Sequence, residues 1–263
     1  MARYCALFSG SKGNATYVGT PAFGVLVDVG VSAKRLCAAL CERDIAPETV
    51  GGVFITHEHS DHVAGLSVLL KRFHWRVFAS AGTLSALVGS NVLPAGTETV
   101  ALTDAPLAVG DMQVQPFHTP HDARESMGFC FEMPDERRIA VATDMGCLLP
   151  QVEALLSTCD LVHIESNHDV GMLQNGPYPY VLQQRILSDR GHLSNAVCAA
   201  ALPRLAAAGV TRFTLAHLSE QNNTPSLAKN TATAALCAAG FTADRDYRLA
   251  VAPPVSASPI TIL

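Results

Sequence analysis

Three histidines and an aspartate crowded into six consecutive positions constrain this chain more than any other feature. An apolar run at 51–56, typical of a buried strand, leads directly into Thr56-His57-Glu58-His59-Ser60-Asp61-His62. Side chains two apart in an extended chain project to the same side, so His57 and His59 can reach one ion. Asp61 and His62, where the chain turns into a helix, can face a second ion beside the first.

The donors in this cluster indicate which ions it suits. They are imidazoles and a carboxylate without any thiolate, which favours Zn²⁺, Mn²⁺ or Fe and disfavours a structural cysteine-type zinc site. The alternative is an exposed polar turn that is rich in histidine by chance. With 10 histidines in 263 residues, such a concentration is improbable, and the buried strand would fix the loop on a rigid support.

Short β-like runs alternate with helix-like segments along the whole chain, which predicts a mixed α and β fold. Predicted strands occupy residues 4–8, 16–19, 24–29, 51–56, 76–79, 112–117, 128–132, 138–143, 161–165 and 212–216. Predicted helices occupy residues 33–43, 62–73, 151–156, 180–189, 195–208 and 225–239, with Ser60 or Asp61 capping the second of them. No linker, charge block or fixed-period repeat divides the chain, so we expect residues 1–263 to form a single domain.

Composition limits the partners and the compartment. The chain is 49% hydrophobic and 16% charged, and its formal net charge is -5, so disorder is excluded as the main state and no global positive field attracts a polyanion. No apolar run approaches the ~18 residues of a membrane helix, and we expect no membrane partner. The N-terminal segment turns polar at Ser9, and the eight cysteines form no Cys-x-x-Cys pair. Both features favour a reducing, cytoplasmic location.

The His-x-His-x-Asp-His pattern resembles the signature of the metallo-β-lactamase superfamily, and the resemblance extends over nearly the whole chain. It implies an α/β (α+β) fold, the αββα four-layer sandwich, with two divalent metal ions at the strand ends. The implied ligands of the first ion are His57, His59 and His121. Those of the second ion are Asp61, His62 and His217, and Asp144 is implied to bridge the two ions.

Two assignments within this resemblance concern neighbouring alternatives. Asp28 resembles the superfamily's first aspartate, which steadies the metal loop by hydrogen bonds and is not a ligand. His118 lies three residues before His121 and competes with it for the third-motif position. His121 is favoured because a Gly-aromatic strand start, Gly128-Phe129, follows it.

Four further segments resemble one branch of the superfamily, the YycJ/WalJ group, which is regarded as bacterial 5′→3′ DNA exonucleases linked to mismatch repair. They are Ser9–Asn14, Glu165–Asp169, Gly191–Asn195 and Ala216–Asn223. The pattern is also similar to tRNase Z, in which a glutamate orients a histidine that protonates the leaving oxygen. By that likeness Glu165 and His192 form the pair. Alternatively, Glu165 caps a helix, His192 bonds backbone in a turn, and Asn167-His168-Asp169 is only a polar loop.

The function implied by these resemblances is a dinuclear metal-dependent phosphodiesterase, most specifically a 5′→3′ DNA exonuclease. It would act through a metal-activated hydroxide with the Glu165–His192 proton-donor pair, and catalysis is expected to depend on these two residues and Asp61. The alternatives are a small-molecule hydrolase of thioesters or lactones and an RNA-processing nuclease of the same superfamily. The stretch between Asp144 and His217 is too short for the large inserted domain of the β-CASP nucleases. The sequence does not indicate an oligomeric state.

One cationic stretch bears on a DNA partner. Lys71-Arg72-Phe73-His74-Trp75-Arg76 interleaves cations with aromatic rings, which is typical of a surface that tracks a backbone and stacks bases. A solvated helix end with a core Trp75 explains the same pattern almost as well. Lys12 and Arg124, on loops beside the predicted ligands, are candidates to meet phosphates. His163 is expected to be a core residue.

Overall fold

The computed structural model describes residues 1–263, which form two compact units. The first unit comprises Met1–His118, Ala123–Arg137 and Pro253–Leu263. The second unit comprises Thr119–Asp122 and Arg138–Ala252.

The first unit is built on a seven-stranded sheet in the order β14-β1-β2-β3-β4-β5-β6. Its strands are β1 (Arg3–Phe8), β2 (Ala15–Gly19), β3 (Gly24–Val27), β4 (Val50–Phe54), β5 (Arg76–Ser80), β6 (Thr99–Leu102) and β14 (Thr261–Ile262). The strands from β14 to β3 pair antiparallel, whereas β3 to β6 pair parallel. Because parallel strands end at the same edge, the segments that follow β3 and β4 emerge side by side.

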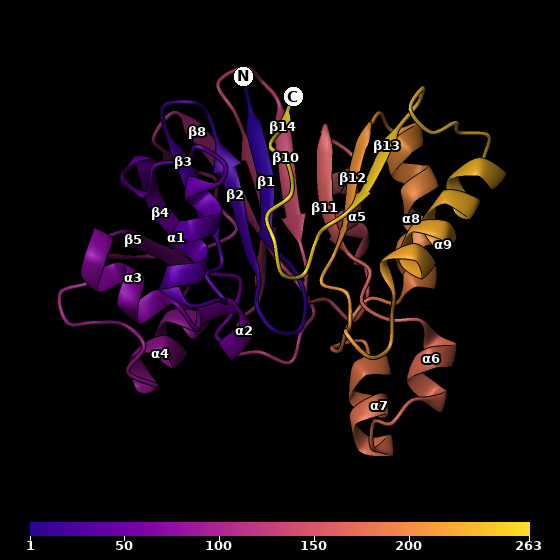
Figure 1. The fold of residues 1–263 in the computed structure, drawn as a ribbon, viewed down its shortest axis with the longest axis horizontal. Coiled ribbons are helices and arrows are strands. Elements are labelled where there is room, and N and C mark those ends of the chain that lie inside the picture. The colour runs from indigo at the N-terminus through magenta and orange to yellow at the C-terminus, as the bar shows by residue number, and fades with distance from the viewer. The chain divides into compact units, whose positions relative to one another are not determined.

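Helices of the first unit cover the apolar face of this sheet. They are α1 (Ala33–Cys41), the 3-10 turn η1 (Pro47–Thr49), α2 (Ser60–Val63), α3 (Leu66–Phe73) and α4 (Ala81–Gly89). Figure 1 shows α1 and α3 alongside the part of the sheet that contains β3 to β5. Leu36 and Leu40 of α1 join Leu66, Leu69 and Leu70 of α3 in one buried cluster with the sheet's apolar side chains. This core holds the metal loop on rigid elements.

The same unit contains a separate antiparallel group of strands, β7 (Leu107–Val109), β8 (Met112–His118) and β9 (Met127–Glu132). The turn between β8 and β9 carries Glu125, whose carboxylate accepts the backbone N–H of Gly82 at 2.7 Å. This bond ties the turn to the start of α4.

The predicted continuous helix at 62–73 is wrong, because the structure divides it into α2 and α3 at Gly65. The N–H of Gly65 donates to the carbonyl of Val29 at 2.9 Å, and a Cβ at Gly65 would lie 2.2 Å from the carbonyl oxygen of Val31. Close approach to the loop after β3 therefore breaks the helix. The predicted cap is also wrong, since His59 occupies the N-cap position and makes no side-chain capping bond.

The second unit is built on the parallel strands β10 (Arg138–Ala142), β11 (Leu161–Glu165), β12 (Arg212–Ala216) and β13 (Arg248–Val251). Its helices are α5 (Pro150–Leu156), α6 (Val170–Asn175), α7 (Tyr180–Leu187), α8 (Asn195–Ala207) and α9 (Pro225–Ala238). Helix α8 packs against α9 and α5, and Figure 1 shows α8 and α9 beside β12 and β13. The loops that follow β10, β11 and β12 meet at one edge of the sheet.

The mixed α and β prediction is confirmed, and apart from the helix at 62–73 the long predicted elements agree with the structure to within a few residues. The elements that the sequence did not reveal are η1, α4, α6, β6, β7, β13 and β14. Most of these strands are short and half-exposed, so they carry no sustained apolar alternation. None of the helices is long and apolar enough to span a bilayer.

Candidate metal centre

Asp28 organises the ligand loop of the first unit. Its Oδ1 accepts the backbone N–H of Thr56 at 2.9 Å, and its Oδ2 accepts the Thr56 hydroxyl at 2.8 Å. The same Oδ2 lies 2.7 Å from Nδ1 of His62. Burial raises the pKa of the Asp28 carboxyl, while His62 and the Thr56 donors act to lower it. Asp28 therefore orients the His62 ring, as the sequence predicts for this residue.

The remaining loop residues place their rings around His62. The centroids of the His57 and His62 rings are 4.1 Å apart, and Nε2 of His57 lies 2.9 Å from Nδ1 of His59. Asp61 places Oδ2 3.4 Å from Nε2 of His62. The rings of His57 and His62 are fully buried, while the Asp61 side chain is 24% exposed. The structure thus gathers the four predicted loop ligands within this unit.

The second unit gathers a different set of side chains at the carboxyl ends of β10, β11 and β12. Oε1 of Glu165 lies 2.7 Å from Nδ1 of His192 and 3.0 Å from Nδ1 of His217. Oδ1 of Asp144 lies 3.3 Å from Nδ1 of His217 and 3.7 Å from Nδ1 of His192. The candidate ligand atoms of these four residues all lie within 4.8 Å of one another.

Glu165 is the centre of this second cluster. Its carboxyl is fully buried, and Oε2 accepts the backbone N–H groups of Met145 at 2.9 Å and Leu193 at 3.2 Å. Burial acts to raise the pKa of Glu165, but His192 and His217 outweigh it, and the pKa lies below its ordinary value. Glu165 is therefore a carboxylate that holds two imidazoles, and the alternative role of a simple helix cap does not describe it.

His121 and His118 lie in different environments. His121 is buried, its Nδ1 lies 3.0 Å from the carbonyl oxygen of Gly191, and its Nε2 lies 3.8 Å from Oδ1 of Asp144. Burial lowers the pKa of His121. The side chain of His118 is 47% exposed and its Nε2 lies 3.4 Å from Oδ1 of Asp104. Of the two histidines, only His121 lies beside another predicted ligand in its own unit.

Three predicted site residues adopt the left-handed backbone conformation within two residues of the end of a strand. Asp28 has φ 60°, Asp144 has φ 57° and His217 has φ 53°. Non-glycine residues enter this region at a free-energy cost, and such strain is concentrated at functional sites. Asp28 and Asp144 both open an Asp-x-Gly segment, Asp28-Val29-Gly30 and Asp144-Met145-Gly146, in this conformation.

The sequence interpretation missed a network of amides that supports the second cluster. Asn195 and Asn223 exchange two side-chain hydrogen bonds of 2.9 Å each, and Nδ2 of Asn223 also donates to the carbonyl of Ser166. Nδ2 of Asn167 donates to the carbonyl of His217 at 2.8 Å. The clustering of asparagines in the segments after β11 and β12 was the available signal. These bonds fix the turns that carry Glu165 and His217.

The cationic stretch at 71–76 packs as a helix end, not as an aromatic surface. Trp75 is 4% exposed, stacks on Phe73 with ring centroids 4.8 Å apart, and donates Nε1–H to the carbonyl of Pro47. Arg72 covers the Phe73 ring at 4.8 Å. The aromatic rings are thus engaged within the first unit, as the core interpretation of this stretch requires.

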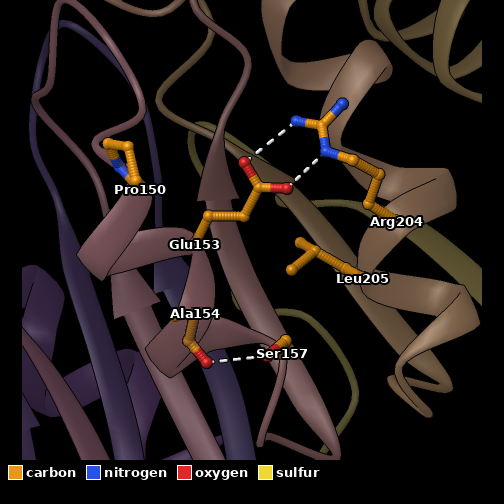
Figure 2. A pocket seen from close by; sticks show the side chains of 6 residues that line it. All are labelled: Pro150, Glu153, Ala154, Ser157, Arg204 and Leu205. Atoms are coloured by element: carbon orange, nitrogen blue, oxygen red, sulfur yellow. Dashed lines mark hydrogen bonds and ion pairs between the residues drawn. The ribbon is translucent and has the colours of Figure 1, made fainter.

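Two surface pockets differ in their relation to the candidate ligands. A pocket of about 290 Å³ between α5 and α8 is crossed by the Glu153–Arg204 ion pair, as Figure 2 shows, and contains no candidate ligand. A pocket of about 620 Å³ in the first unit is lined by Glu58, Arg124 and the small residues of α4. Glu58 lies between the predicted ligands His57 and His59, so the second pocket adjoins the segment that carries them.

The donor sets of both units fit divalent ions, because they consist of imidazoles and carboxylates positioned by neighbouring hydrogen bonds. In the first unit the Asp28 carboxylate fixes the His62 ring from behind. In the second, four candidate donors converge within 4.8 Å. Neither set includes a cysteine, and none of the eight cysteines forms a disulfide.

Comparisons with known proteins identify the family of the chain. The family model described as "Beta-lactamase superfamily domain" matches residues 24–218. The chain is 34% identical over 262 residues to exodeoxyribonuclease WalJ of Streptococcus pneumoniae serotype 2 (strain D39 / NCTC 7466), covering 98% of this chain and 97% of the relative. It is 35% identical over 241 residues to exodeoxyribonuclease YycJ of Bacillus anthracis, covering 90% of each.

Solved structures extend the similarity to the fold. The metallo-beta-lactamase fold protein YhfI from Bacillus subtilis matches with a TM-score of 0.73 at 15% identity, covering 98% of this chain and 99% of that chain. The predicted family and αββα fold are therefore confirmed. The chain belongs to the metallo-β-lactamase superfamily.

Proposed function

We propose that the chain is a divalent-metal-dependent exodeoxyribonuclease that digests DNA in the 5′→3′ direction. The observation that carries the proposal is the contact of 2.7 Å between Oε1 of Glu165 and Nδ1 of His192. An alkoxide that leaves phosphorus needs a proton donor, and such a pair can supply one. Two relatives that match most of the chain are named exodeoxyribonucleases.

Glu165 and His192 have distinct roles in this proposal. The Glu165 side chain is fully buried, whereas the His192 side chain is 20% exposed. Since Nδ1 of His192 is bound to the carboxylate, Nε2 is the nitrogen from which a proton would pass to the leaving oxygen. The buried carboxylate stabilises the imidazolium before transfer and orients the ring, so Glu165 acts through His192.

We further propose that the predicted ligands bind two divalent ions, Zn²⁺, Mn²⁺ or Fe, whose identity depends on metal availability. The proposed ligands of the first ion are His57, His59 and His121. Those of the second ion are Asp61, His62 and His217, and Asp144 is the proposed ligand of both. When bound, the ions would lower the pKa of the attacking water and neutralise charge on the phosphate. Support comes from the family and from the donor chemistry of each unit.

The charge of the chain shapes its expected association with DNA. The formal net charge is -5, so bulk electrostatics do not attract a polyanion, and bound divalent ions would concentrate positive charge where the phosphate lies. We propose weak, salt-sensitive association that relies on a partner for recruitment. Arg124, which lines the 620 Å³ pocket, is a candidate phosphate contact.

The proposal covers the whole chain as one domain in the cytoplasm. The match to YhfI extends over 98% of the chain, which supports a single domain at residues 1–263. The absence of Cys-x-x-Cys pairs in the sequence supports a reducing compartment.

A substrate panel tests the proposed reaction class. The metal-loaded protein is incubated with single- and double-stranded DNA, RNA of the same sequence, a generic phosphodiester, a thioester and a lactone. We expect DNA to be digested fastest and digestion to stop when a chelator is added. Thioester or lactone turnover well above DNA digestion would contradict the proposal in favour of a small-molecule hydrolase, and faster RNA cleavage would favour an RNA-processing nuclease.

A further inference from the structure

Asn14 lies beside Asp61 and His62, two of the proposed ligands, and has no role in the function proposed above. It ends the loop Ser9–Asn14 between β1 and β2, and its side chain is buried, with 7% of the residue exposed. A polar side chain at such a depth costs free energy unless hydrogen bonds satisfy it. The partners of Asn14 therefore indicate why it is there.

The backbone holds Asn14 against the metal loop from both sides. Its N–H donates to the carbonyl of Asp61 at 2.8 Å, and its carbonyl accepts the N–H of Gly30 at 2.8 Å. A Cβ at Gly30 would lie only 1.6 Å from the carbonyl oxygen of Asp61, so only glycine permits this approach. The loop before β2 is thus bound both to α2 and to the loop after β3.

The amide of Asn14 has a defined orientation. Its Oδ1 accepts the backbone N–H of Gly10 at 2.9 Å, so the opposite end of the amide must be the NH₂ group. That group places Nδ2 3.1 Å from Nε2 of His62 and 3.3 Å from Oδ2 of Asp61. One donor group therefore faces both candidate ligand atoms.

The tautomer of His62 fits this donor. The Asp28 carboxylate lies 2.7 Å from Nδ1 of His62, which places the ring proton on Nδ1. Nε2 then presents a lone pair, and the NH₂ group of Asn14 donates to it. Oδ2 of Asp61, 3.4 Å from Nε2, is the second acceptor that this NH₂ group serves.

We propose that Asn14 is a positioning residue for the Asp61–His62 pair. Its amide donates to both acceptors and so holds Nε2 of His62 and Oδ2 of Asp61 toward the same point. An ion held by Nε2 of His62 would take the place of that hydrogen bond, and the amide would still orient Oδ2 of Asp61. The inference rests on the metal centre proposed above and adds a residue outside its ligand set.

The first test replaces the amide and measures metal affinity. Residues that orient ligands typically contribute tenfold to a hundredfold to affinity. In Asn14→Ala we therefore expect one Zn²⁺ ion to bind tenfold to a hundredfold more weakly, measured by competition with a chromophoric chelator, while the other ion is little affected. Asn230→Ala, an exposed position on α9, is the matched control.

The second test separates the donor from the loop anchor, because Asn14→Ala removes both. Asn14→Asp is isosteric and keeps an oxygen to accept the N–H of Gly10, but it sets a carboxylate against Asp61 and Nε2 of His62. Repulsion should destabilise the metal-free variant and be relieved by a cation. We expect Zn²⁺ to raise the melting temperature of Asn14→Asp more than that of wild type. The rise for Asn14→Ala should be smaller than that for wild type. Asn230→Asp controls for the added charge.

The outcomes distinguish this inference from the proposed function. If wild type binds no Zn²⁺, the metal centre itself is wrong. If wild type binds Zn²⁺ and Asn14→Ala binds it equally well, Asn14 does not position the ligands. If Asn14→Asp shows the wild-type affinity and the wild-type rise in melting temperature, Asn14 only anchors the loop, and the inference is overturned.

Discussion

The two clusters of candidate ligands reach similar chemistry by different routes. In the first unit, the four predicted ligands come from the single segment 57–62, and Asp28 and Asn14 contact this segment from neighbouring loops. In the second unit, the clustered residues come from segments that follow three parallel strands and from the loop before α8. The first cluster is encoded by closeness in sequence, whereas the second exists only because parallel strands end at one edge.

The two clusters also differ in what fixes their geometry. Backbone approaches that only glycine permits, at Gly30 and Gly65, hold the loop of the first unit. A buried carboxylate, Glu165, holds two imidazoles and two backbone N–H groups in the second. The first cluster should therefore be sensitive to steric change around the loop, and the second to loss of a single charge.

The largest expected effect is removal of a ligand from the first cluster. Asp61→Ala should lower chelator-sensitive DNA digestion by about a thousandfold or more, because a carboxylate that meets an ion is lost where substrate charge is neutralised. Digestion of end-labelled duplex and bound metal are measured together. Asp111→Ala, in an exposed turn between β7 and β8, is the control, and undiminished digestion by Asp61→Ala would rule out the proposed centre.

The next effect tests whether the second cluster acts through a proton. Glu165→Gln and His192→Ala should lower kcat for DNA by about a hundredfold to ten-thousandfold, the usual range for general acid catalysis. The loss should be much smaller with a p-nitrophenyl phosphodiester, whose leaving group needs no proton. Equal losses on both substrates, or loss of bound metal in Glu165→Gln, would instead make Glu165 and His192 part of the metal-binding set.

A steric change should affect the first cluster without altering any charge. Gly30→Ala places a methyl group against the Asp61 carbonyl, and such overpacking typically costs about 1–3 kcal/mol of unfolding free energy. Gly89→Ala, where a Cβ meets nothing within 4 Å at the end of α4, should instead be neutral or stabilising by up to about 1 kcal/mol. Chemical denaturation compares the two. Equal stabilities would show that the loop tolerates displacement.

The smallest effect concerns pH and lies in the second unit. Burial lowers the pKa of His168 to about 4 and that of His163 to about 3. In the unfolded chain these histidines bind protons near pH 6.5, whereas in the folded chain they bind them only at lower pH. The free energy of unfolding therefore keeps their full contribution above pH 6.5 and falls by about 1.4 kcal/mol per pH unit per group below it. His168→Asn should therefore lose roughly 2 kcal/mol less between pH 7 and pH 5 than wild type. An identical decline in both proteins would contradict a neutral His168.

The sequence predicted the parts of the site that are local or that resemble a known motif. The composition of segment 57–62 predicts a metal site directly. Asp144, Glu165 and His217 lie at the ends of apolar runs that are typical of strands. The sequence did not show that Asn14 faces His62. That contact depends on how β1, β2, β3 and β4 pair in turn within the sheet, and on the close backbone approach at Gly30. It also missed the helix break at Gly65 for the same reason.

Side-chain direction was the other feature that patterns left open. Cations and aromatic rings alternate at 71–76, and both a nucleic-acid surface and a helix end fit that pattern. Only the packing shows Trp75 directed into the first unit, since a single residue's rotation about a helix end decides between core and surface. The choice between His118 and His121 likewise needed burial, not spacing.

The central claim is metal-dependent 5′→3′ digestion of DNA, and a polarity assay tests it most directly. Duplex DNA labelled at either the 5′ or the 3′ end of one strand is incubated with the metal-loaded protein, with and without chelator. We expect immediate release of the 5′ label as a short product and gradual shortening of the 3′-labelled strand. With chelator we expect no digestion. Earlier release of the 3′ label, or digestion that survives the chelator, would contradict it.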